Sequence, residues 1–218
     1  MFKNFHNIRN IFGGVTIVEL IVVIFIFTVI TSITIFNYGS FNTSLSIQNL
    51  ADDIALTVRR AQGYAIGVRG YGDSFDEGYG IHFTATPGSL YAGSNKSFIL
   101  FADVGTISNN IYDYNNYDTC GNLENNECIE VLSIRSADEI NAIYLNDETE
   151  VRSSTGTLDI LFKRPNPEPS FCYRMNGDTS SCDESSNISS IKIKISSSDN
   201  LGVYKIITIS NNGQISVQ

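Results

Sequence analysis

The sequence is poor in charge, and above all in positive charge. Only 17% of its 218 residues are charged, and 14 lysines and arginines stand against 23 acidic residues, for a formal net charge of −9. Such a chain has no overall positive field to attract nucleic acid. Neutral polar residues replace the missing charges, which favours an exported protein. Its 42% hydrophobic content excludes a largely disordered chain.

The sequence also lacks the motifs of common catalytic sites. It contains no G-x-S-x-G, no H-E-x-x-H and no phosphate-binding loop. His82 lies in an alternating segment and is expected to be an edge-facing, hydrogen-bonded side chain. Asp73, Asp76 and Glu77 fall in a glycine-rich loop, where a structural or solvated role is expected. We therefore expect no enzymatic activity, and an exported enzyme on an uncleaved anchor is the weakest alternative.

Cysteines are few, and their spacing does not suit zinc. The four form two local pairs, Cys120 with Cys128 and Cys172 with Cys182, whereas paired zinc ligands normally have two to four residues between them. Three disulfide connectivities are possible. Pairing within each local pair is favoured because short loops close easily.

Patterns that bind other metals or cofactors are weak as well. Asp113, Asn115 and Asp118 offer oxygen ligands for calcium, but Tyr117 breaks the EF-hand spacing and no bidentate acid closes the loop. We expect no metal and no cofactor.

One long apolar run stands out against this polar composition. Residues 15–36 contain a single charged side chain, Glu19. As a helix this run spans about 33 Å, enough to cross the hydrocarbon core of a bilayer. Lys3 and Arg9 precede it without any acid, which predicts a cytoplasmic N-terminus and an external remainder.

The run does not have the layout of a cleaved secretory signal. No A-x-A site follows it, and Ala51 is the first alanine in the chain. Gly13 and Gly14 instead precede the run, where they would leave the chain accessible to a peptidase at the membrane surface. Cleavage there would remove a basic leader and leave the apolar helix on the mature protein.

Glu19 is an unusual residue for a simple anchor. An acid at mid-bilayer costs roughly 2.5 to 3.5 kcal/mol unless it finds a partner. An α-amino group freed at Val15 would lie four residues away in the same helix, or alongside in a neighbouring one. In the second arrangement Glu19 would promote assembly of subunits.

Residues 14–20, Gly-Val-Thr-Ile-Val-Glu-Leu, and the apolar run after them resemble the prepilin processing motif of type IV pilins and type II secretion pseudopilins. The resemblance implies that Gly14 is the last leader residue, that Val15 becomes a methylated N-terminus, and that Glu19 docks the subunit into a filament. It implies prepilin peptidase and other pilin or pseudopilin subunits as partners. It also implies a single-pass protein of the inner (cytoplasmic) membrane that assembles into an extracytoplasmic filament.

The amphipathic segment after the apolar run predicts how the chain is divided. We expect a leader at 1–14, a transmembrane helix at 15–38, an amphipathic helix at 39–66 and an extracytoplasmic β-rich head at 67–218. The helix is expected to pack on the head through apolar residues spaced three or four apart: Ile47, Leu50, Ile54, Val58, Ala61 and Ala65.

The remainder of the chain predicts strands only. They are expected at 80–85, 97–102, 128–135, 140–145, 157–163, 191–195, 203–210 and 214–217. One long helix followed by strands predicts an α+β fold with an antiparallel sheet, as in pilins. The Gly-Tyr-Gly-Ile-His-Phe stretch is similar to H-type pseudopilins and FimT-like minor pilins. The segment that carries Pro165, Pro167 and Pro169 is expected to be a surface loop.

A DNA-binding minor pilin for DNA uptake remains the second hypothesis. It requires a basic cluster on the head, for which the candidates are Lys163, Arg164, Lys192, Lys194 and Lys205. Loss of the leader would leave 12 basic against 23 acidic residues, a net charge of −11, which disfavours nucleic acid as a partner. The resemblance does not distinguish a pilus from a secretion pseudopilus.

Overall fold

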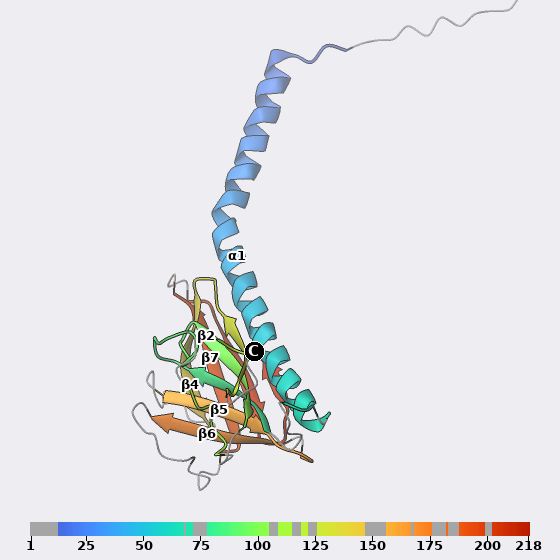
Figure 1. Ribbon diagram of the computed structural model, residues 1–218. Coiled ribbons are helices and arrows are strands. Elements are labelled where there is room, and N and C mark those ends of the chain that lie inside the picture. The colour runs from blue at the N-terminus through green and yellow to red at the C-terminus, as the bar shows by residue number, and fades with distance from the viewer. Residues whose placement is uncertain are drawn as a thin grey trace, which may run out of the picture. The chain divides into compact units, whose positions relative to one another are not determined.

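The structure is a computed structural model that describes residues 13–67, 69–71, 78–104, 109–114, 119–121, 126–146, 156–166, 168–175, 182, 188–198 and 202–218. The chain divides into two compact units, Met1–Asn42 and Thr43–Gln218. Helix α1, Ile17–Ile66, contributes residues to both units (Figure 1).

In the first unit, the described residues form a short non-helical segment, 13–16, and the N-terminal part of α1. This part of the helix is rich in Ile, Val and Thr, residues with modest helix propensity in water. A helix is nevertheless the structure that satisfies every backbone polar group of a single segment in lipid. The apolar composition therefore explains why this segment is helical despite its β-branched side chains.

In the second unit, α1 packs through one apolar face, as its spacing predicts. The six predicted face residues, from Ile47 to Ala65, are each no more than 8% exposed. They join one hydrophobic core with residues from both sheets, among them Phe83, Phe98 and Ile193. The helix ends at Ile66, where the expected glycine-rich segment begins.

Strands follow the helix in the α+β order that the sequence predicts (Figure 1). The first sheet has the antiparallel order β3-β2-β1-β5-β6 and the second the order β4-β7-β8-β9. Their bounds are β1 Gly78–Thr84, β2 Ser97–Asp103, β3 Cys128–Ser133, β4 Asp138–Leu145, β5 Gly156–Phe162, β6 Pro169–Met175, β7 Ser190–Ser197, β8 Tyr204–Ser210 and β9 Ile215–Val217.

Strand β6 corrects one sequence prediction. The proline-rich segment was expected to be a surface loop, but Pro169 is the first residue of β6 and pairs with Phe162. Proline has no amide to donate and is tolerated at the first residue of a strand and in edge strands. Strand β6 satisfies both conditions, because it is the last strand of its sheet.

The first sheet has two buried faces. Tyr79, Ile81 and Phe83 of β1 join the main core with α1. On the opposite face, Ile99, Phe101 and other side chains form a second, smaller cluster. Because side chains alternate between the faces of a strand, His82 lies on the side of this second cluster.

Candidate functional site

The segment that resembles a prepilin processing site is exposed. Residues 13–16 precede α1 and are exposed, with Val15 at 69%. A side chain placed on Gly13 or Gly14 would meet no atom within 4 Å, so packing within the protein does not explain these two glycines. The structure leaves the Gly14–Val15 peptide bond open to a protease.

Thr16 and Glu19 define the beginning of the helix. The Glu19 amide donates to the Thr16 hydroxyl at 3.3 Å, and the Leu20 amide donates to the Thr16 carbonyl at 3.2 Å. Thr16 therefore acts as the N-cap, and Glu19 occupies the third helical position, the spacing of a capping box. A carboxylate in the first turn also interacts favourably with the helix dipole. The sequence signal for this cap is the Thr-x-x-Glu spacing of residues 16–19. These residues also belong to the processing motif, and the spacing was not interpreted as a helix cap.

The apolar run presents its side chains outward. By length and composition α1 can cross a membrane, and the most apolar stretch of the helix has no buried residue. Its hydroxyl groups are satisfied within the helix, because Thr28, Thr31, Ser32 and Thr34 each donate to a carbonyl three or four residues earlier. Polar side chains bonded in this way are compatible with lipid.

Comparison of the chain with protein-family models, with curated proteins and with solved structures found no match. The pilin family therefore remains a resemblance, carried by residues 14–20 and the apolar helix that follows.

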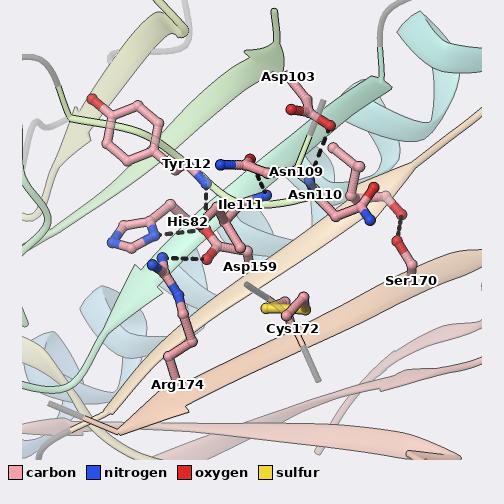
Figure 2. The surroundings of a disulfide bond; sticks show 12 residues. His82, Asp103, Asn109, Asn110, Ile111, Tyr112, Asp159, Ser170, Cys172 and Arg174 are labelled. Atoms are coloured by element: carbon pink, nitrogen blue, oxygen red, sulfur yellow. Dashed lines mark hydrogen bonds and ion pairs between the residues drawn. A yellow bond between two sulfur atoms is a disulfide. The ribbon is translucent and has the colours of Figure 1, made fainter. Parts of the chain in front are cut away.

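The head contains a buried charged cluster centred on Asp159 of β5. Its two carboxylate oxygens bind His82 Nδ1 at 2.7 Å and Arg174 Nη2 at 2.9 Å (Figure 2). The side chain of Asp159 is fully buried, and those of His82 and Arg174 are 4% and 15% exposed. Burial of a carboxylate requires such partners.

The position of His82 corrects the expectation of an edge-facing histidine. Strand β1 lies in the middle of its sheet, between β2 and β5, and His82 pairs across the ladder with Asp159. The pairing of a histidine with an acid 77 residues away depends on strand order, which the sequence does not specify. The only sequence signal for this pair is that His82 and Asp159 are each a polar residue within a largely apolar strand.

Residues 109–114, here called the strap, cover this face of the sheet. Three buried acids each accept a backbone amide from the strap: Asp103 from Asn110 at 3.2 Å, Asp159 from Tyr112 at 3.3 Å, and Glu127 from Asp113 at 2.6 Å. The amide of Ile111 donates to the side chain of Asn109. Figure 2 shows the contacts to Asp103 and Asp159. Four consecutive amides are thus satisfied by side-chain oxygens.

Burial and nearby acids perturb two groups at the strap. Burial, assisted by the charges of Asp113, Asp103 and Asp159 and opposed by the hydrogen bond from the Asp113 amide, raises the pKa of Glu127 to about 9. Burial also raises the pKa of Tyr112, and the charge of Glu127 adds to this effect. These directions follow from the cost of a charge in a weakly solvated site. Glu127 is therefore expected to be protonated at neutral pH.

Both cysteine pairs form disulfide bonds, Cys120–Cys128 and Cys172–Cys182. This is the pairing that short loops favour. The second bond ties residue 182 to the edge strand β6. Cys128 belongs to the smaller apolar cluster, and Cys120 packs against it.

The calcium candidates are only partly described. Asp113 accepts a hydrogen bond from Asn109 at 2.8 Å, while Asn115 and Asp118 lie outside the described residues. Among the residues that are described, no group of three or more His, Cys, Asp or Glu could hold a metal ion. The acidic residues Asp73, Asp76 and Glu77 also lie outside the described part of the chain.

The basic residues proposed for DNA binding do not share one surface. Lys163 forms an ion pair with the buried Asp103 at 3.7 Å. Lys194 pairs across the sheet with Ile206, whereas Lys205 pairs with the buried Ile195. Directly paired residues lie on the same sheet face, so Lys194 and Lys205 lie on opposite faces.

Of the other two candidates, only Lys192 shares a sheet face with Lys194. It lies two residues from Lys194 along β7. Arg164 follows the end of β5 in the other sheet. The described head therefore contains a pair of lysines on one face and no continuous basic track through all five candidates.

Proposed function

We propose that this protein is a minor type IV pilin or a type II secretion pseudopilin, a structural subunit with a pilin fold. In this proposal prepilin peptidase cleaves between Gly14 and Val15, the new N-terminus is methylated, and the apolar part of α1 anchors the subunit in the inner membrane. The head lies outside the cytoplasm, and the helix then docks into a filament of similar subunits.

The observation that carries this proposal is the arrangement at the beginning of α1. The exposed Gly14–Val15 peptide bond lies outside the helix. Thr16 then caps the first helical turn, and Glu19 lies in that turn. The helix then continues as an apolar surface long enough for a bilayer. A protein retained by a plain anchor would need neither the glycines nor the acid.

Glu19 has no side-chain ion pair among the described residues, which fits a residue that binds another subunit. The nearest cation expected in an assembly is the terminal amine of a neighbouring chain, which exists only after cleavage before Val15. In a low-dielectric environment such a pair is much stronger than in water. Filament formation would then provide the partner that makes the acid tolerable in lipid.

Substitution of Glu19 tests this role. We expect Glu19→Ala to be expressed, inserted and cleaved but absent from sheared filaments. Because Ala also removes the carboxylate from the capped turn, Glu19→Gln is the matched control: Gln is also accepted at this position of a capping box but carries no charge. Loss of incorporation in both variants supports the proposal, whereas normal incorporation of Glu19→Gln would refute a charge-dependent docking role.

A further inference from the structure

A groove of about 270 Å³ runs between α1 and the open edge of the first sheet. Its helix side is formed by Leu50 and Asp53, and Phe98 of β2 also lines it. The remaining lining residues belong to β3 and to the two residues after it. Strand β3 is the terminal strand of its sheet, so one of its long sides has no partner strand.

The backbone of β3 presents hydrogen-bonding groups along this edge. The amide of Ile134 donates to Lys96 at 2.8 Å, and Leu132 and Ser133 are registered with Phe98 and Ser97 of β2. In an antiparallel ladder, successive residues direct their N–H and C=O groups alternately to either side. The groups of Val131 and Ser133 therefore point away from β2, and no described residue outside the sheet bonds to them.

The side chains of the groove provide an apolar floor between charged rims. Phe98 and Leu50 are 2% and 8% exposed, so they are covered but still line the groove. Asp53 is exposed on the helix side, and Arg135 is exposed two residues after β3 ends. Glu130 is already engaged by Arg60 of the helix.

We infer that this groove binds an extended segment of another protein, which adds to β3 as a further strand. Only an extended backbone can pair with the alternating groups of Val131 and Ser133. One apolar side chain of the segment covers the floor at Phe98, and a basic side chain reaches Asp53. A second copy of this chain fits less well, because each copy carries a net charge of −9 and the copies repel one another.

The substitution Ser133→Pro distinguishes strand addition from other modes of contact. Because the Ser133 amide points away from β2, Ser133→Pro removes no hydrogen bond of the β2–β3 ladder, but its ring blocks an added strand. Ser133→Ala keeps the amide and is the matched control. Asp53→Lys reverses the charge on the helix side of the groove and leaves β3 unchanged. If Ser133→Pro lowers the Tm, binding by the groove is tested with Asp53→Lys instead.

The experiment uses the full chain in its native membrane, with Arg135 replaced by p-benzoylphenylalanine as a photochemical probe. Irradiation is expected to produce one adduct whose crosslinked peptide comes from a different protein. The adduct should persist with Ser133→Ala, fall at least tenfold with Ser133→Pro, and fall several-fold with Asp53→Lys. Amide exchange at Val131 and Ser133 should slow at least tenfold in the crosslinked complex.

Four results would overturn the inference, and three of them concern the adduct itself. They are absence of any adduct, an adduct of equal yield in a folded Ser133→Pro variant, and a crosslink to a second copy of this chain. Unchanged amide exchange at Val131 and Ser133 within an adduct would also overturn it, because the contact would then not be a β-strand.

Discussion

The hydroxyl of Thr16 accepts the backbone amide of Glu19 at 3.3 Å, so the acid of the motif lies in a turn that the motif itself caps. The two residues thus stabilise the first turn of the helix within a single chain. This relationship gives Thr16 a definite role: it fixes the first helical residue at Ile17 and leaves Gly14 and Val15 outside the helix.

Removal of the Thr16 cap is expected to loosen the first turn of α1. Thr16→Val preserves shape but loses the hydroxyl, which should destabilise the turn by about 0.5–2 kcal/mol. Thr16→Ser keeps the cap and serves as the control. Amide exchange at Glu19 and Leu20 in detergent micelles measures the effect. Equal exchange in Val and Ser variants would show that the hydroxyl contributes nothing.

Neutralising Asp159 is expected to destabilise the head strongly. Asp159→Asn keeps the size of the side chain but leaves the guanidinium of Arg174 without its buried counter-charge. Removal of one partner of a buried pair typically costs about 3–5 kcal/mol. Urea unfolding of the full chain in detergent checks this value.

The half-exposed ion pair between Arg60 and Glu130 is the internal control for that measurement. Pairs near the surface contribute about 0–1 kcal/mol, so Arg60→Gln should have a small effect. If Asp159→Asn were no more destabilising than Arg60→Gln, the cluster would not stabilise the head.

The raised pKa of Glu127 predicts that this residue's contribution to stability declines as the pH rises. Its pKa in the folded protein is about 9, above the value of about 4.3 for an unfolded chain. Between these values the folded state binds more protons than the unfolded state, so the free energy of unfolding decreases as the pH rises. Glu127→Gln removes this contribution and keeps an oxygen acceptor for the Asp113 amide.

The comparison for Glu127 is made at pH 5, 7 and 9. The stability of the Gln variant relative to the original protein should increase across this series, and equal pH dependence of the two proteins would argue against a buried, protonated Glu127. Changes common to both proteins arise from other groups and cancel in the difference.

The helix and most strands could be predicted because their patterns are local. Spacings of three and four placed Ile47, Ile54 and Ala65 on one buried face, and the structure confirms it. The alternation of Ile and Lys in β7 likewise buries Ile191, Ile193 and Ile195. Such patterns depend only on the geometry of one element.

The features that were missed depend on contacts between distant segments. Strand β6 exists because it pairs with β5, and its initial proline obscured it. The position of His82 required knowledge that β1 lies between β2 and β5. The hydrogen bonds of the strap depend on three acids from separate parts of the chain, which accept backbone amides from one short segment. No local sequence pattern encodes such contacts.

The most direct test of the account is the intact mass and N-terminal sequence of the protein purified from membranes of cells that contain prepilin peptidase. We predict loss of residues 1–14, an N-terminus at Val15 and the mass of one added methyl group. Recovery of the chain from functional material with Met1 at its N-terminus would contradict the proposed function.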